Sequence, residues 1–306
     1  MDMYQKRKIR AEKKKDDSSK SFPSVGINWF PGHMVKAKRE IKENLKLVDV
    51  VIEIVDARIP RSSRNPDFEE LVGTKPRIIA LNKFDLADPT INKEWIKYYN
   101  GNGIEAVLIN SITGVGIKEL LARASNLVKD KLEKSNERGR IGRSVRVAVI
   151  GIPNAGKSSF INKVANRNTA AVGNKPGVTR TRQWIRTNSG VELMDTPGIL
   201  WPKFENEEIG LNLAFTGAIK YEILDNAELA LKLIGKLRVN YLKELCERYK
   251  LSDIEGKTDL EVMEEIGNKR GCKISGGEID YTKTANIIMD EFRKNVIGKI
   301  SLERPM

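Results

Sequence analysis

Cysteine and histidine are scarce in this chain of 306 residues, and long apolar segments are missing. The two cysteines, Cys246 and Cys272, have neither the spacing of a metal site nor the number that a disulfide framework needs, so we expect the reducing environment of the cytoplasm. No apolar run approaches the ~18 residues of a membrane span, and the first twenty residues lack the apolar core of a signal peptide. These absences predict a cytoplasmic protein with no membrane partner.

Positive charge dominates the composition, with a formal net charge of +13. Such an excess favours a polyanionic partner, although a solvated basic surface would also explain it. The lysine-rich residues 1–27 show no apolar periodicity, and we predict a disordered basic tail there. The last hundred residues are slightly acidic, so an argument for nucleic acid must begin with the tail and the middle of the chain.

Residues 28–205 alternate between short β-branched strands and amphipathic helices, which predicts an α/β domain with a mostly parallel sheet. After residue 205 the strand signal fades, and residues 206–306 are expected to form a smaller all-helical domain. Within that domain, Thr258 and Glu261 have the spacing of a capping box, and Gly271 suits the end of a helix. The expected strands are 48–57, 76–83, 105–111, 145–151 and 191–198, a linker is expected at 134–144, and the expected helices are 91–100, 116–134, 207–237, 258–271 and 281–295.

The segment GIPNAGKS, residues 151–158, matches the phosphate-loop pattern G-x-x-x-x-G-K-[ST] between a predicted strand and a predicted helix. Backbone N–H groups in such a loop cradle phosphates, the lysine places charge on the β and γ phosphates, and the last hydroxyl holds Mg²⁺. This match alone could be accidental. The candidate nucleotide contacts are Asn154, Ala155, Gly156, Lys157, Ser158 and Ser159, and Ser158 is also a candidate Mg²⁺ ligand.

The segment DTPG, residues 195–198, follows another predicted strand. Asp195 is a candidate carboxylate for Mg²⁺, and the backbone N–H of Gly198 can meet a γ-phosphate. Aspartate, proline and glycine are also ordinary turn formers, so this segment alone would be read as a turn.

The segment NKFD, residues 82–85, is typical of a guanine-binding loop. Asp85 would accept hydrogen bonds from guanine N1–H and N2–H₂, which adenine does not offer and which contribute on the order of 1.5–3 kcal/mol each. Asn82 would face O6 and N7, and Lys83 would pack on the base and brace the phosphate loop. Downstream, Ser111 and Ile112 could present backbone to O6. Each piece is also compatible with a simple turn, but all of them end predicted strands, where parallel sheets bind ligands.

The order of these motifs differs from that of a usual GTPase, in which the phosphate loop comes first. Here NKFD precedes GIPNAGKS, and DTPG comes last. This order indicates a circular permutation cut after the DTPG segment, with the linker at 134–144 joining the natural ends. The segment after Gly198 then leads into the helical domain, so a γ-phosphate contact could move that domain.

The permuted motifs together resemble the ribosome biogenesis GTPase A family, and the match runs from about residue 28 to residue 305. The resemblance implies a Mg²⁺-dependent GTP hydrolase that binds GTP and GDP, docks on the precursor of the large ribosomal subunit through ribosomal RNA and ribosomal proteins, and is a monomer off the ribosome. It also implies an RNA-binding role for the helical domain. The segments that carry it are NWFPGHM, DARIP, NKFD, GIPNAGKSS, PGVTR, DTPG and LAFTGAI.

Hydrolysis requires a group that orients the attacking water, and many GTPases place glutamine directly after the DTPG glycine. Here that residue is Ile199. The resemblance assigns the role to His33, the only histidine, although a lone histidine is more often structural. The resemblance also places Asn154 beside a K⁺ ion. Within PGVTR, Thr179 is our candidate for the first-switch Mg²⁺ ligand, and Thr181 is the alternative.

Three functions therefore stay open from the sequence. The first is a GTPase that acts as a timer in ribosome assembly, with hydrolysis triggered by the particle. The second, favoured by Ile199, is a guanine-nucleotide-dependent RNA-binding module with little or no hydrolysis of its own. The third is a permuted ATPase or kinase in which NKFD is accidental. A basic cluster in the helical domain supports RNA binding only weakly; it comprises Lys269, Arg270, Lys273, Lys283, Arg293, Lys294 and Lys299.

Overall fold

The computed structural model describes residues 31–130, 133, 143–165, 184–187, 190–201, 204, 206–219, 226–252 and 254–306. The expected tail at 1–27 and nearly all of the expected linker at 134–144 lie outside this part of the chain. Among the described residues, no helix has the length and apolar character that crossing a bilayer would require.

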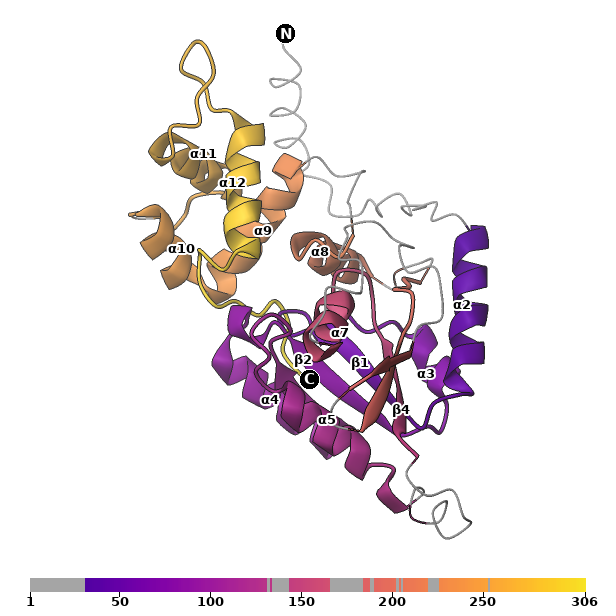
Figure 1. The fold of residues 1–306 in the computed structure, drawn as a ribbon. Helices are drawn as coiled ribbons and strands as arrows, with labels where there is room; N and C mark the ends of the chain where they lie inside the picture. Colours follow the sequence, from indigo (N-terminus) through magenta and orange to yellow (C-terminus); the bar gives the residue numbers. More distant parts are fainter. Residues whose placement is uncertain are drawn as a thin grey trace.

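A six-stranded sheet forms the centre of the N-terminal region, in the order β3-β2-β1-β4-β6-β5 (Figure 1). The first five strands of this order pair in parallel, as predicted, whereas β5 pairs with β6 in antiparallel fashion. The three-residue β5 was not expected from the sequence, because it is too short to show a period. The strands are β1 (Val50–Asp56), β2 (Arg77–Asn82), β3 (Glu105–Ile109), β4 (Val145–Ile150), β5 (Trp184–Arg186) and β6 (Val191–Asp195).

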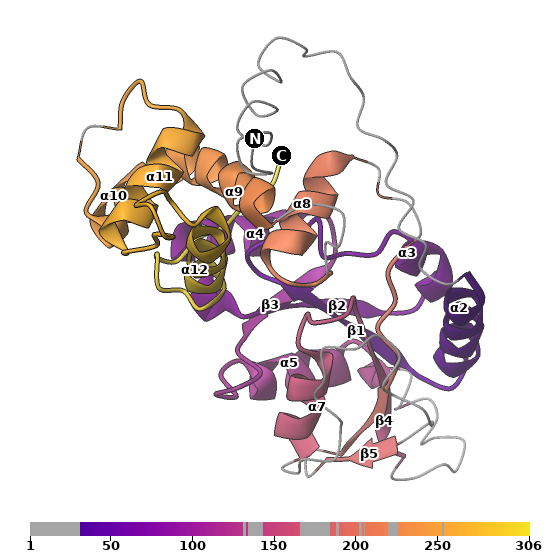
Figure 2. The same cartoon turned by 90° about the horizontal axis from the view of Figure 1, so that it is seen from above.

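Helices cover both faces of this sheet, which explains why its strands are apolar at nearly every position. Along β1, Val50, Ile52 and Ile54 pack on the face with α5 and α7, while Val51 and Val55 pack on the opposite face with α2, α3 and α4. Figure 2 shows these helices from above. They are α2 (Pro31–Leu45), α3 (Asp67–Val72), α4 (Pro89–Gly101), α5 (Ile117–Asn126) and α7 (Lys157–Ala165), with a short 3-10 helix η2 at Phe84–Leu86.

The C-terminal region is helical, as predicted, but the single helix expected over 207–237 is wrong. Helix α8 ends at Phe215, and the backbone turns at Gly217, whose φ of 75° is in the left-handed region. The apolar periodicity continues across this turn, so the pattern alone could not locate it. The helices are α8 (Glu207–Phe215), α9 (Asn226–Asn240), α10 (Leu242–Tyr249), α11 (Asp259–Lys269) and α12 (Tyr281–Arg293).

Two local predictions in this region are confirmed. Thr258 and Glu261 form the reciprocal hydrogen bonds of a capping box at the start of α11, and Gly271 just beyond its end has a φ of 65°. These contacts begin and end the helix by satisfying backbone groups that the helix itself leaves unpaired. The apolar stripe of α12 is buried, comprising Ala285, Ile288, Met289 and Phe292.

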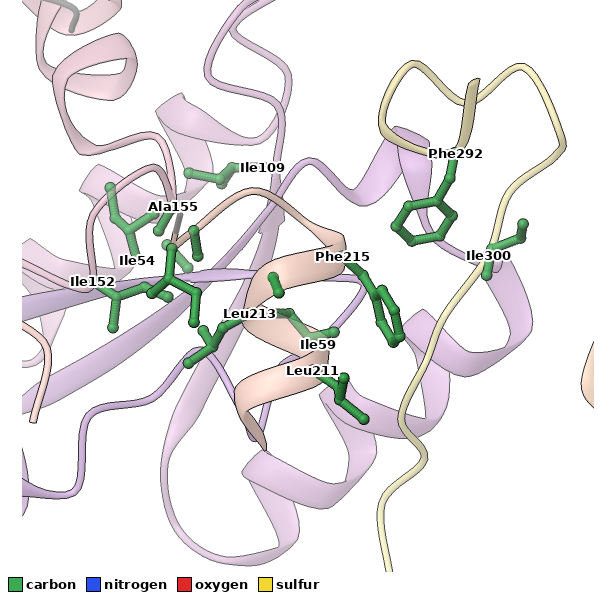
Figure 3. Packing of buried hydrophobic residues seen from close by; sticks show 14 of the residues in the cluster. Ile54, Ile59, Ile109, Ile152, Ala155, Leu211, Leu213, Phe215, Phe292 and Ile300 are labelled. Carbon is green, nitrogen blue, oxygen red and sulfur yellow. The ribbon is translucent and has the colours of Figure 1, made fainter. Parts of the chain in front are cut away.

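The helical region and the sheet share one continuous apolar cluster. Ile54 lies on one side of α8, and Phe292 and Ile300 lie beyond Phe215 on the other (Figure 3). Because α8 packs into this cluster, it lies between the sheet and the helices α9 to α12. The boundary at residue 206 stays a prediction.

The last residues of the chain return to the sheet region. The buried Glu303 carboxylate accepts hydrogen bonds from the backbone N–H of Arg61 at 2.7 Å and of Ser62 at 3.1 Å. It also accepts from the amide of Asn212 in α8 at 3.0 Å, and the indole N–H of Trp95 donates to its carbonyl. The chain end therefore fastens α8 and α4 to the loop that follows β1.

Candidate nucleotide site

The loop between β4 and α7 wraps tightly around neighbouring strand ends. At Gly151, whose φ is 148°, a Cβ atom would lie 2.4 Å from the Ile54 carbonyl oxygen. At Gly156, with φ of 103°, it would lie 2.1 Å from the amide nitrogen of Asn82. Only glycine fits at either position. The loop ends at the N-terminus of α7, where free backbone N–H groups and the helix dipole favour phosphate.

Lys157 and Gly198 meet on the phosphate side of this loop. The Lys157 ammonium is buried and donates to the Ile152 carbonyl at 2.7 Å. Burial lowers the pKa of Lys157 to about 8, although the nearby Asp195 carboxylate opposes that shift. A Cβ atom on Gly198 would lie 2.7 Å from the Lys157 Nζ and 3.1 Å from the Pro153 backbone nitrogen. The DTPG turn therefore touches the phosphate loop directly.

The residues around Gly198 are anchored in the core. Asp195 is the last residue of β6, and the Thr196 hydroxyl donates to the Val149 carbonyl at 2.7 Å. Ile199 is buried at 3 % exposure within the cluster formed by α2, α3 and the sheet, and its carbonyl accepts from the Asn65 amide. An apolar side chain held in the core cannot orient a water molecule for attack.

Asn82, at the end of β2, ties two loops together. Its amide nitrogen donates to the Ala155 carbonyl at 2.7 Å, and its amide oxygen accepts from the Ser111 N–H at 3.0 Å and hydroxyl at 2.9 Å. One amide N–H remains beyond these contacts, because an asparagine amide carries two. Ile112, next to Ser111, is 80 % exposed, and its backbone N–H donates to the side-chain oxygen of Asn110 at 2.8 Å.

Lys83 and Asp85 continue this loop. Lys83 has a left-handed backbone with φ of 60°, and its ammonium donates to the Asn154 carbonyl at 2.8 Å and to the Asp56 carboxylate at 2.9 Å. Asp85 lies in η2, and its Oδ1 atom is buried without a hydrogen-bond partner among the described residues. An unpaired carboxylate oxygen is an acceptor that the N–H groups of guanine can satisfy.

Two predicted residues fall outside what the structure describes. His33 belongs to α2, but its side chain is not described, and Thr179 lies within the undescribed 166–183. The candidate metal ligands can therefore be located only in part. Ser158 is half-buried near the start of α7, and Asp195 lies at the end of β6. The part of the chain that the structure describes has no cluster of three or more His, Cys, Asp or Glu residues that could hold a metal.

Asn154, the candidate K⁺ ligand, has a contact that the sequence does not indicate. Its exposed side chain donates to the Gly217 carbonyl at 2.9 Å, just beyond α8. Arg293 of α12 donates in turn to the carbonyls of Ala214 and Phe215 at the end of that helix, at 2.8 and 2.9 Å. The phosphate loop therefore touches the helical region directly.

Comparison with known proteins identifies the class of site. The family of 50S ribosome-binding GTPases matches residues 146–263, beginning in β4 just before the phosphate loop. The chain is 46 % identical over 279 residues to Ribosome biogenesis GTPase A of Bacillus pumilus, covering 91 % of this chain and 99 % of that protein. This chain belongs to the ribosome biogenesis GTPase A family. Like other members, it is a GTP hydrolase.

Further relatives of this chain extend the comparison. Mitochondrial ribosome-associated GTPase 1 of the mouse is 32 % identical, covering 92 % of this chain and 93 % of that one. The GNP-bound YlqF structure from T. maritima is 28 % identical with a TM-score of 0.59, covering 88 % of this chain and 98 % of that one. A GDP-bound YlqF structure is 26 % identical with a TM-score of 0.62, covering 87 % and 99 %. Those two structures contain guanine nucleotides.

The GTPase fold of the family is thus confirmed, with a mostly parallel six-stranded sheet followed by a helical region. The phosphate loop, the DTPG turn and the NKFD loop follow β4, β6 and β2, and all of them meet at the carboxyl ends of the parallel strands. Two further residues lie next to this site without a role predicted from the sequence: Asp56 contacts Lys83, and Arg58 contacts Asp56. The signal available for them was the segment DARIP at the end of a predicted strand.

Proposed function

We propose that this GTPase is an assembly factor that docks on the immature large ribosomal subunit and hydrolyses GTP when the particle triggers it. The close approach of Gly198 to Lys157 and Pro153 supports the proposal, because Gly198 lies at the start of the segment leading into α8 and its N–H would sense the γ-phosphate. The names of its relatives, a net charge of +13 and the guanine-binding loops give further support.

Nucleotide binding is proposed to divide between two groups of residues. Asn82, Lys83, Asp85, Ser111 and Ile112 read and brace the guanine base. The loop from Asn154 to Ser159 and the Gly198 N–H hold the phosphates. Mg²⁺, when bound, neutralises charge on the β and γ phosphates; Ser158, Asp195 and Thr179 would hold it, and Asn154 would hold K⁺.

Hydrolysis needs a water-orienting group other than Ile199, because that side chain is buried in the core. We assign this role to His33, whose neutral imidazole can orient water or accept its proton near pH 7. Binding to the particle would bring His33 into position, so that hydrolysis reports docking. Intrinsic turnover is then slow, which is what the alternative of a non-hydrolysing RNA-binding module also predicts for the isolated protein.

Ribosomal RNA is the proposed ligand of the exposed cations. The basic cluster of the helical region is smaller than its sequence indicates. Lys269, Arg270 and Lys294 form ion pairs with Glu265, Glu291 and Asp290, and Arg293 holds the end of α8. Lys273, Lys283 and Lys299 are exposed and form no ion pair with another described residue. These three are the candidates for phosphate contacts on RNA.

The deciding experiment measures GTP turnover by the wild type and His33→Ala, each with and without large ribosomal subunits. The proposal expects particle-stimulated turnover in the wild type, loss of stimulation in the variant, and equal GTP binding by both. Equal stimulated rates would remove His33 from the mechanism. An absence of stimulation in the wild type would favour the RNA-binding module.

A further inference from the structure

A single buried carboxylate joins two cations beneath the guanine-binding loop. Asp56 ends β1 with its side chain 3 % exposed. Its Oδ1 atom accepts from the Arg58 backbone N–H at 3.1 Å and Nε at 3.0 Å. Its Oδ2 atom accepts from Arg58 Nη2 at 2.8 Å and from Lys83 Nζ at 2.9 Å. Both oxygens of the carboxylate are therefore fully used.

The position of Lys83 depends on this carboxylate. Lys83 has a left-handed backbone conformation just after the end of β2, so its side-chain direction is not set by the alternation of the strand. Only two acceptors hold its ammonium in the described structure, the Asn154 carbonyl of the phosphate loop and Asp56. Burial lowers the pKa of Lys83, and the Asp56 carboxylate opposes that shift. Asp56 thus keeps the ammonium both charged and in place.

Arg58 fixes the carboxylate itself. Its side chain is 2 % exposed, and its two-pronged pairing with Asp56 allows one orientation of the carboxylate. The guanidinium carbon lies 5.5 Å from the centre of the Phe292 ring in α12. Burial alone would raise the pKa of the Asp56 carboxyl, but Arg58 and Lys83 hold that pKa well below its usual range. These two cations therefore favour the charged form of the carboxylate.

We propose that Asp56 and Arg58 are positioning residues for guanine-nucleotide binding, which act by holding the Lys83 ammonium against the phosphate loop. Lys83, just after β2, thereby connects the end of β1 to the loop after β4 in the absence of nucleotide. This role rests on the nucleotide site proposed above and adds two residues to it that touch neither base nor phosphate.

The test is a double-mutant cycle on GDP affinity with Asp56→Asn, Lys83→Met and the combined variant. Asp56→Asn alone should lower the affinity for GDP about tenfold or more, because a charge-assisted bond is lost. In the Lys83→Met background the same change should have little effect.

Asp49→Asn is the matched control. Asp49 precedes the opposite end of β1, is also buried, and pairs with Arg143 at 3.1 Å. It reproduces the loss of a buried carboxylate without touching Lys83, so its GDP affinity should match that of the wild type. If Asp56→Asn does not fold, Arg58→Lys replaces it. That change keeps the charge but loses the two-pronged contact, and its effect should likewise vanish in the Lys83→Met background.

The outcomes separate this proposal from the nucleotide site on which it rests. If the wild type fails to bind GDP, the nucleotide site itself is wrong. If the wild type binds and the Asp56 or Arg58 change costs the same affinity with and without Lys83→Met, the two residues do not act through Lys83 and the positioning role is wrong.

Discussion

The two sides of the nucleotide site are built differently. On the guanine side, buried hydrogen bonds from Asn82 and an exposed hydrogen bond from Lys83 tie the loops to one another. On the phosphate side, Gly198 meets Lys157 and Pro153 through close backbone approach. We propose that the first arrangement holds the base in either nucleotide state. We propose that the second responds to the phosphate between the loops, and the segment after Gly198 leads into the helical region.

The largest effect is expected on the guanine side, from Asp85→Asn. The amide cannot accept both guanine N–H groups, so the affinities for GDP and GTP should fall on the order of 10²- to 10⁴-fold. Xanthosine nucleotides should gain in relative affinity because they offer the complementary acceptor. Competition binding measures both effects. Asp88→Asn is the control, since that side chain caps α4 and an amide can do the same. Unchanged GDP affinity in Asp85→Asn would end the guanine assignment.

Asn82→Ala should lower the affinity for guanine nucleotides equally whether or not a γ-phosphate is present. The change leaves groups on Ser111 and Ala155 unpaired, at about 1–3 kcal/mol for each buried group. Calorimetric titration should show equal losses for GDP and for a non-hydrolysable GTP analogue. Asn102→Ala, which removes an exposed amide contact to Tyr98, is the control. A loss confined to the analogue would contradict a fixed base platform.

Gly198→Ala should have the opposite signature. The added Cβ meets Lys157 and the backbone of Pro153, and overpacking of this kind costs about 1–3 kcal/mol. We expect most of this cost to appear as lower affinity for the GTP analogue and little of it as lower affinity for GDP. The same titrations measure both affinities. Gly101→Ala is the control, because a Cβ atom there meets nothing within 4 Å. Equal losses for both nucleotides would show that Gly198 does not sense the γ-phosphate.

The smallest effect is a pH dependence of the phosphate side. The pKa of Lys157 is lowered to about 8, so the ammonium is already charged below that pH and affinity should be level there. Above pH 8 the free protein loses this charge, and GDP affinity should fall about tenfold per pH unit. Lys157→Arg, which stays charged throughout, should give a level profile. A wild-type profile that stays level to pH 9.5 would contradict the assignment.

Much of the arrangement of the nucleotide site could be predicted from the sequence, because each motif ends a strand and parallel strands end at one edge of a sheet. That rule places the phosphate loop, DTPG and NKFD together without coordinates. The rule does not predict contacts between side chains on different strands, so the Asp56–Lys83 ion pair could not be predicted. The break at Gly217 was missed because apolar residues continue on both sides, and only the backbone conformation shows the turn.

The route from Gly198 to the helical region is the central claim, and binding to large ribosomal subunits tests it most directly. Sedimentation with subunits over a range of salt concentrations should be measured with GDP and with a non-hydrolysable GTP analogue. The account predicts tighter association in the analogue-bound state, lost steeply as salt rises because phosphate contacts carry it. Association that is the same with both nucleotides would contradict it.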